Sequence, residues 1–280
     1  MKFSSILLSS VLFATTIFAA PSGVRRGTTL AQRLAARASR SGNTLQLVDS
    51  TITQNLNTTN TEYSTNWAGA VIESPPASAT FTAVVATITV PTPSVPSGSS
   101  SGGNTEYAAS AWVGIDGDTC STAILQTGVD FYAESNGGTS FDAWYEWYPD
   151  YAYDFSGITI SAGDVIVMTV TSSTSKKGTA VIENQTTGVT VSKTLTSTSS
   201  LCGENAEWIV EDFEENDELV AFADFGTVTF TGCVATDADS STFGLDDAEV
   251  IEIVSTSGRS TTILTDVEII SDTELQVTYE

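Results

Sequence analysis

Two strand-like segments, residues 122–130 and 206–213, carry polar side chains that could take part in chemistry. Successive side chains of a strand point to opposite faces, so Gln126 faces away from the aliphatic residues beside it in the first segment. The same alternation places Glu207 and Glu211 on one face of the second segment. Carboxylates are depleted in mid-strand unless they are paired or functional. A solvated outer-face position is the alternative for an isolated glutamate.

The chain contains no histidine, and this restricts the chemistry that it could perform. Without histidine there is no Ser-His-Asp or Cys-His nucleophile, no HExxH zinc site and no histidine general base. The Asp-[Ser/Thr]-Gly sequence that each half of an aspartic protease requires is also missing. Cysteine spacing gives no metal signature either. A catalytic site in this chain would therefore consist of carboxylates, amides and aromatic donors.

The elements that must position these side chains are strands. From about residue 63 onward, short segments rich in Thr, Val, Ile and aromatic residues alternate with Gly, Pro, Asn and Ser. No ten-residue helical pattern competes with them. Several segments place aliphatic residues on one face and polar or bulky aromatic residues on the other, as the sheets of a sandwich do. The sequence predicts an all-β fold, a two-sheet antiparallel β-sandwich of the jelly-roll type.

The first 60 residues differ from the rest of the chain. Lys2 precedes an apolar run at 6–19, which is typical of a secretory signal peptide and too short to span a membrane. We expect the signal at 1–20, a basic pro-segment at 21–60 that inhibits the domain, and a β-sandwich domain at 61–280. A basic linker without inhibitory function is the alternative for 21–60. The signal predicts a secreted, extracellular protein.

The domain expected at 61–280 is strongly acidic, with 33 acidic and four basic residues and a formal charge of −29. Such a surface repels polyanions, which argues against nucleic acid and anionic membranes as partners. Carboxylates are partly protonated in acid, where this self-repulsion falls, so the composition suits an acidic medium. Alternatively, the acidic residues serve only to keep the protein soluble.

Four strings of the sequence carry a more specific signal. They read YSTNWAGAVI (63–72), SAWVGIDGDTCSTAILQTGVDFY (110–132), DAWYEWYPDYAYDFSGITISAGD (142–164) and AEWIVEDFEENDELVAFADF (206–225). Together they resemble the glutamic peptidases, or eqolisins, a family of fungal secreted acid peptidases, and the resemblance extends from about residue 63 to about residue 254. It implies a sandwich related to legume lectins (concanavalin A-like). It also implies a catalytic pair made of Gln126 and Glu211, and not Glu207.

The resemblance has further implications for individual residues. The residues that it places in motifs lining or supporting the cleft are Trp112, Asp116, Asp130, Asp142 and Glu146. Three cysteines in a secreted chain indicate one disulfide and one remaining thiol. The resemblance implies that Cys120 pairs with Cys202, which leaves Cys233 unpaired.

The sequence therefore predicts an acid endopeptidase that acts on proteins or peptides without a cofactor or metal, as a monomer. Glu211 would activate water as a general base, and Gln126 would donate to the oxyanion. Five aromatic residues offer apolar area for substrate side chains: Trp112, Trp144, Tyr145, Trp147 and Tyr148. One alternative is a glycoside hydrolase that uses Glu146 and Glu211 as its two carboxylates. Another is a lectin that binds carbohydrate without catalysis.

Overall fold

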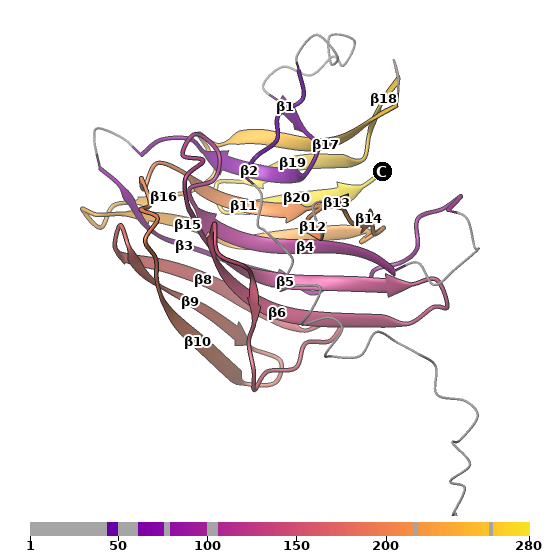
Figure 1. Cartoon of the computed structure of the whole chain (residues 1–280), viewed down its shortest axis with the longest axis horizontal. Helices are drawn as coiled ribbons and strands as arrows, with labels where there is room; N and C mark the ends of the chain where they lie inside the picture. The colour runs from indigo at the N-terminus through magenta and orange to yellow at the C-terminus, as the bar shows by residue number, and fades with distance from the viewer. Residues whose placement is uncertain (1–43, 50–60, 76–78, 100–105, 216–217, 258–259) are drawn as a thin grey trace, which may run out of the picture.

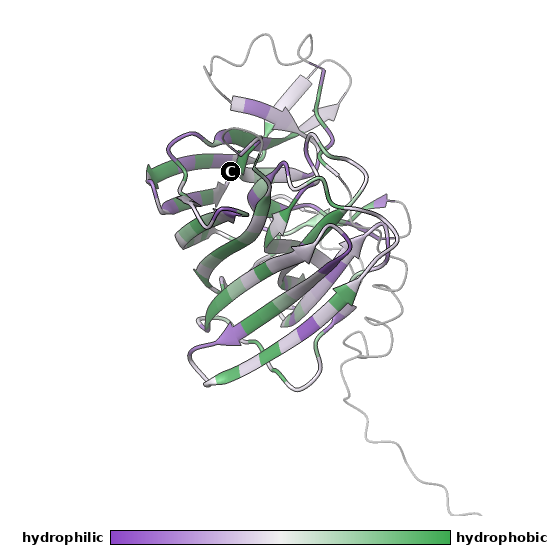
Figure 2. Cartoon of the chain, turned by 90° about the vertical axis from the view of Figure 1, so that its left-hand side faces the viewer, coloured by the Kyte–Doolittle hydropathy of each residue, from purple (hydrophilic) through white to green (hydrophobic). Residues whose placement is uncertain are grey.

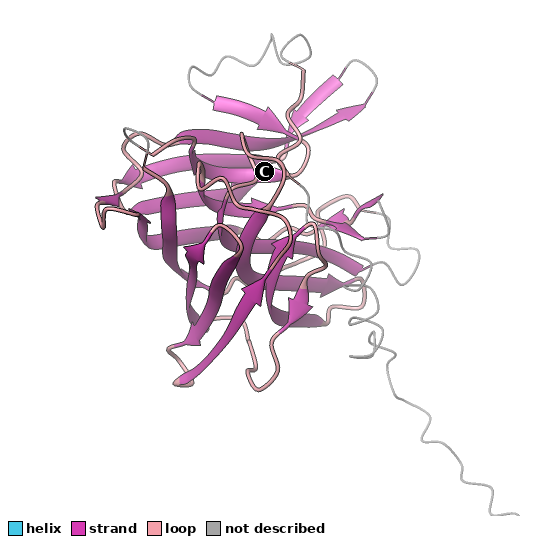
Figure 3. Ribbon diagram, turned by 60° about the vertical axis from the view of Figure 1, so that its left-hand side comes forward, coloured by secondary structure: helices cyan, strands magenta, loops and turns pink. Residues whose placement is uncertain are grey.

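The computed structural model of the chain describes residues 44–49, 61–75, 79–99, 106–215, 218–257 and 260–280. Within these ranges the chain forms strands and loops, without helix (Figure 3). The expected signal at 1–20 lies outside the described residues, as does most of the expected pro-segment, residues 21–43 and 50–60. No helix among the described residues is long and apolar enough to cross a membrane.

The larger sheet contains ten strands and carries the candidate site (Figure 1). Its main path runs through β1 (Thr61–Ser64), β17 (Glu249–Ser257), β2 (Trp67–Ile72), β11 (Ala206–Glu211), β4 (Glu106–Ile115), β5 (Ile124–Glu134), β6 (Thr139–Tyr148) and β7 (Tyr153–Asp154). Two further strands lie off this path, β14 (Ala221–Phe222) beside β4 and β18 (Ser260–Ile263) beside β17. From β2 to β7 each neighbouring pair is antiparallel.

The second sheet contains eight strands. In order these are β10 (Val189–Thr196), β9 (Lys177–Asn184), β8 (Val165–Thr174), β3 (Phe81–Thr89), β15 (Thr227–Asp237), β20 (Glu274–Tyr279) and β19 (Thr265–Ser271), with β16 (Thr242–Phe243) beside β15. A small third sheet pairs β12 (Glu214–Glu215) with β13 (Glu218–Leu219). The two large sheets form a sandwich, so the predicted all-β, two-sheet architecture is confirmed.

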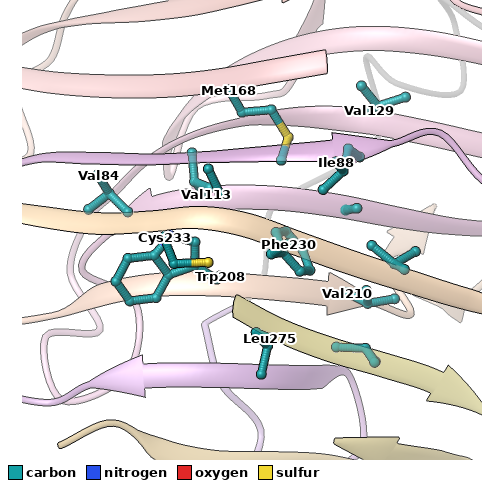
Figure 4. Close-up of a cluster of buried hydrophobic side chains, with 14 of the residues drawn as sticks. Val84, Ile88, Val113, Val129, Met168, Trp208, Val210, Phe230, Cys233 and Leu275 are labelled. Atoms are coloured by element: carbon teal, nitrogen blue, oxygen red, sulfur yellow. The ribbon is translucent and has the colours of Figure 1, made fainter. Parts of the chain in front are cut away.

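The main core lies between the two large sheets. Val113 and Val129 from the larger sheet pack in one cluster with Ile88, Met168 and Phe230 from the second sheet (Figure 4). In Figure 2 hydrophobic residues alternate with more polar ones along the strands, which is the period-2 pattern that the sequence shows. Each fully buried aliphatic or aromatic side chain contributes about 1.5–3 kcal/mol to folding. This burial holds the larger sheet in place and leaves its opposite face available for a site.

One disulfide cross-links the larger sheet. Cys120, in the loop before β5, is bonded to Cys202, in the loop before β11, as the resemblance implied. Cys233 on β15 is a free cysteine, buried in the main core, where removal from water raises the pKa of its thiol to about 12. The thiol of Cys233 is therefore kept in its protonated, unreactive form.

Candidate active site

Glu211 lies at the end of β11, in the middle of the larger sheet. It is opposite Trp67 on β2 and Ser110 on β4, and its side chain is 1% exposed. The indole N–H of Trp112 donates a hydrogen bond of 2.9 Å to Glu211 Oε2. A hydrogen bond to a charged acceptor is stronger than one between neutral groups. Trp112 therefore fixes the orientation of this carboxylate.

Gln126 lies on β5, two strands away from β11. It is opposite Gly114 on β4 and Glu146 on β6, and its side chain is also 1% exposed. The Gln126 Nε2 donates to Glu146 Oε2 over 3.0 Å. The bond to Glu146 thus holds one of the two N–H groups of the amide and leaves the second for another acceptor.

The strand order brings these groups to one face of the sheet. On β4, Ser110 is opposite Glu211 and Gly114 is opposite Gln126, so Trp112 occupies the position midway between them. By the alternation of side chains, all of these positions point away from the main core. Gln126 and Glu211 therefore lie on one face of the sheet, with the position of Trp112 between them.

A second hydrophobic cluster surrounds these polar groups. It contains Trp67, Trp112, Trp144 and Ile209, all fully buried, and the rings of Trp67 and Trp112 meet edge to face at 4.9 Å. Removal from water strengthens the hydrogen bonds of Glu211 and Gln126. The site thus consists of a few carboxyl and amide groups surrounded by buried apolar side chains.

Not all of the expected aromatic residues lie on this face. Trp147 packs in the main core on the opposite face of β6, and its indole donates to the Ser199 carbonyl. With Tyr145 it lines a cavity of about 410 Å³ beside β10, away from Gln126 and Glu211. Of the five expected aromatic residues, Trp112 and Trp144 therefore lie in the cluster of the site face and Tyr148 packs against it, whereas Tyr145 and Trp147 lie elsewhere.

Asp130 and Asp142 lie beyond Glu211 in the same row of the sheet. Asp130 is opposite Ser110 on β4 and Asp142 on β6. The hydroxyls of Ser110 and Tyr132 donate to the Asp130 carboxylate at 2.7 and 3.0 Å. Ser110 and Tyr132 were missed at the sequence level, although both share the alternation of their strands with Trp112 and Gln126. Together these residues form a polar extension of the site.

Asp116 acts on the backbone of another loop. Its carboxylate accepts four backbone N–H groups, those of Cys202, Gly203, Glu204 and Asn205, at 2.7–3.3 Å. Burial raises the pKa of Asp116, and these four hydrogen bonds oppose the shift. Asp116 therefore fixes the loop that leads into β11, the strand that carries Glu211.

One group of three potential metal ligands occurs among the described residues: Asp116, Cys120 and Cys202. Because the two cysteines are joined in a disulfide, their sulfurs cannot act as thiolate ligands. The donor set around Gln126 and Glu211 is suited to acid–base chemistry on water.

Two further carboxyls are buried on β11 and directly after it. Burial, together with the negative charges of Asp116, Asp118 and Glu211, raises the pKa of Glu207 well above its ordinary value. Burial, together with Glu211 and Glu214, does the same for the pKa of Asp212. Both groups therefore favour the protonated form under conditions in which exposed carboxyls ionise.

Comparison with known proteins shows what this chain is similar to. The model of the Peptidase A4 family matches residues 65–279. Aspergillopepsin-2 of Aspergillus niger is 48% identical over 293 residues, which cover 100% of both chains. Scytalidopepsin B of Scytalidium lignicola is 42% identical, over 91% of this chain and 92% of that protein.

Solved structures that are similar to this chain come from the same kind of protein. A crystal structure of scytalido-glutamic peptidase with a transition state analog inhibitor is 43% identical, with a TM-score of 0.66, over 77% of this chain and 98% of that one. The crystal structure of aspergilloglutamic peptidase from Aspergillus niger is 57% identical, with a TM-score of 0.58, over 62% of this chain and 99% of that one.

Proposed function

The chain belongs to the Peptidase A4 family, the eqolisins, and we propose that it hydrolyses peptide bonds in proteins with Gln126 and Glu211 as its catalytic pair. The observation that carries this assignment is the geometry on the site face. The indole of Trp112 anchors the Glu211 carboxylate at 2.9 Å, and Glu146 anchors the Gln126 amide at 3.0 Å. Each member of the pair is thus held by a separate partner in an apolar setting.

Glu211 supplies the base and then the acid. In its ionised form the carboxylate takes a proton from a water molecule while the water oxygen attacks the scissile carbonyl carbon. The same proton then passes from Glu211 to the nitrogen of the leaving amine as the carbon–nitrogen bond breaks. Because one residue performs both transfers, the reaction requires no histidine.

Gln126 stabilises the charge that develops on the carbonyl oxygen. Its second N–H, the one not held by Glu146, donates to the oxyanion of the tetrahedral intermediate. An amide carries no ionisable proton, so this donor works at any acidity. A single donor of this kind contributes roughly 2.7–4 kcal/mol to transition-state stabilisation. The enzyme can therefore work in acid as long as Glu211 is ionised.

The same proposal includes a secreted precursor with an inhibitory segment. Residues 44–49 fall in the expected pro-segment and lie against the site face. The Leu45 side chain packs on the cluster that contains Trp67 and Trp112, and its backbone N–H donates to the Gly117 carbonyl at 3.1 Å. The side chain of Gln46 donates to Glu214 at 3.3 Å. Such contacts obstruct a substrate, and removal of the segment would clear the face.

A glycoside hydrolase that uses Glu146 and Glu211 fits the site less well. Glu146 already accepts the hydrogen bond that orients Gln126, and it lies on β6, three strands away from β11. The two carboxylates of a glycosidase must instead flank one glycosidic bond. Hydrolysis of polysaccharide by the mature protein would favour this alternative over the peptidase.

The experiment that tests the proposed function is the hydrolysis of an acid-denatured protein by the mature form and by its Glu211→Gln variant. Glu211→Gln keeps the size and polarity of the side chain and removes the base, so kcat should fall at least about 10³-fold. The variant should keep the fold, as judged by circular dichroism. Glu268→Gln, at an exposed position on β19 in the other sheet, is the matched control. Near-normal activity of Glu211→Gln would reject the role.

A further inference from the structure

A third carboxyl of the site face is not used by the mechanism above. Glu207 lies on β11, four residues before Glu211, and its side chain is 0% exposed. Neither of its carboxyl oxygens has a hydrogen-bond partner within standard geometry among the described residues. A buried polar group without a hydrogen-bond partner destabilises the fold unless a ligand or a neighbouring group satisfies it. Its position in the sheet indicates what it could bind.

Glu207 belongs to one row of residues that crosses four strands. Glu207 on β11 is opposite Gly114 on β4, Gly114 is opposite Gln126 on β5, and Gln126 is opposite Glu146 on β6. Two strand spacings, about 10 Å, separate the backbones of Glu207 and Gln126. The residue between them, Gly114, has no side chain of its own, and the space above it is shared by the Trp112 ring and the Glu207 carboxyl.

The Glu207 carboxyl leans over this glycine. A Cβ atom built at Gly114 would lie 3.1 Å from Glu207 Oε2 and 2.8 Å from Cζ3 of Trp112. Gly114 thus leaves the space that the Glu207 carboxyl and the Trp112 ring occupy. The carboxyl is thereby directed from β11 toward β5.

The Gln126 amide has an open acceptor, its oxygen Oε1. Its Nε2 points to Glu146 on β6, and in a planar amide the oxygen lies on the opposite side of the group from the nitrogen. Gln126 Oε1 therefore lies on the side of the amide that is turned away from Glu146. It is buried and has no hydrogen-bond partner among the described residues.

The electrostatic surroundings keep Glu207 in the form that can donate. Burial has the largest effect on its pKa, and the acidic groups Asp116, Asp118 and Glu211 raise it further. The Asp118 backbone N–H, which also donates to Asn205 Oδ1, opposes this shift in part. In the protonated form the Glu207 carboxyl carries an O–H donor, whereas a carboxylate could only accept.

We propose that Glu207 is a positioning residue, whose carboxyl O–H donates to Gln126 Oε1, directly or through one bridging water. The inference rests on the role of Gln126 in the proposed function. Glu146 and Glu207 then hold the amide from its two ends, and the remaining N–H of Gln126 is aimed at the substrate oxyanion. A hydrogen bond accepted by Oε1 also polarises the amide, and that makes its N–H a stronger donor.

Two variants of the mature protein test this inference. Glu207→Gln keeps an N–H donor in the same place, whereas Glu207→Met keeps the size of the side chain and has no donor. We expect kcat of Glu207→Met to fall about 10- to 100-fold with little change in KM, because the misdirected amide affects the transition state. Glu207→Gln should retain most of the wild-type kcat. If Glu207 only stabilised the fold, Glu207→Met and Glu207→Gln would have the same kcat whenever their unfolding temperatures are equal.

A spectroscopic measurement reports on the Gln126 amide itself. Its side-chain ¹⁵N–¹H signals can be assigned by their loss in Gln126→Ala. They should shift in Glu207→Met and stay close to their wild-type positions in Glu207→Gln. If Glu207→Met does not fold, infrared spectroscopy decides the question: a protonated carboxyl band at about pH 6 that disappears in Glu207→Gln supports the inference, and its absence overturns it.

The outcomes separate this inference from the proposed function. Wild-type kcat in Glu207→Met, with Glu211→Gln inactive, would overturn the positioning role and leave the catalytic pair intact. A loss in Glu207→Gln as large as in Glu207→Met, with both variants stable, would also overturn it. Activity in Glu211→Gln would reject the catalytic pair, whatever the Glu207 variants do.

Discussion

The indole N–H of Trp112 and the Oε2 atom of Glu211 are 2.9 Å apart, although 99 residues separate them in the sequence. Strand pairing brings them together, because β4 and β11 are adjacent in the larger sheet. The hydrogen bond links Trp112, in the hydrophobic cluster of the site, to Glu211, the proposed general base. The effect of removing it can be measured.

Replacement of Trp112 by phenylalanine should remove this donor and keep most of the ring. A carboxylate that loses a hydrogen bond becomes easier to protonate. The acid limb of the kcat/KM profile should therefore move to higher pH, and kcat should fall by about 10-fold. Trp147→Phe is the matched control, because it loses an indole N–H that donates to the Ser199 carbonyl, away from the site face. An unmoved acid limb in Trp112→Phe would count against the role of Trp112.

Replacement of Gln126 by alanine should reduce kcat about 10²- to 10³-fold, with a smaller effect on KM, because the oxyanion donor acts mainly in the transition state. Steady-state kinetics on a peptide substrate measure both constants. Gln276→Ala, at a glutamine of β20 in the other sheet, should behave like the wild type. A Gln126→Ala variant that raises KM and leaves kcat intact would mean that Gln126 binds substrate only.

The stability of the domain should fall as the pH rises. Burial, with a contribution from Glu73 and Glu62, raises the pKa of Asp118 to about 6 from 3.8. The folded state therefore holds a proton that the unfolded state has lost, and the associated stability is present below about pH 4 and is lost by about pH 6. The raised pKa values of Glu207 and Asp212 act in the same direction.

Asp118→Asn should therefore weaken the pH dependence of the unfolding temperature between about pH 4 and about pH 6. Differential scanning calorimetry at several pH values measures this. Asp247→Asn, at an exposed aspartate, is the control. If Asp118→Asn kept the full wild-type slope in this window, Asp118 would not be a source of the pH dependence.

The inhibitory contact of the pro-segment can be tested with a synthetic peptide of residues 21–60 added to the mature enzyme. Leu45→Ser in this peptide should weaken inhibition about 10-fold, because a partly buried leucine contributes about 1–1.5 kcal/mol. Leu47→Ser is the matched control, since the Leu47 side chain is 55% exposed. Equal inhibition by both variants would show that the packing of Leu45 on the tryptophans is irrelevant to inhibition.

The sequence predicted those features that depend on local periodicity. The two-residue alternation of a strand correctly placed Gln126 on a polar face, and the same rule grouped Glu207 with Glu211. The all-β class followed from short segments rich in Thr, Val and Ile. These properties are repeated over a few residues, and no knowledge of distant partners is needed to recognise them.

The neighbours of these residues could not be derived in this way. The bonds from Gln126 to Glu146 and from Trp112 to Glu211 depend on the order β11-β4-β5-β6, which is set by pairings over long separations. Asp116 shares the alternation of Trp112, yet its backbone adopts a φ of +67° and its carboxylate turns to the loop before β11. The Asp-Gly pair at 116–117 indicates a turn, but it does not reveal which loop the Asp116 carboxylate will bind.

The disulfide has a consequence for how the proposed catalytic residues are connected. Gln126 comes six residues after Cys120, and Glu211 comes nine residues after Cys202. Gln126 lies near the start of the loop that the disulfide closes, a sequence separation of 82, so the shortest covalent route between the two residues runs through the disulfide and avoids the part of the loop that contains β8, β9 and β10. In the chain-entropy model, closing a loop of this length stabilises the fold by about 4.5 kcal/mol. A single backbone break anywhere in that loop would still leave Gln126 and Glu211 tethered to each other.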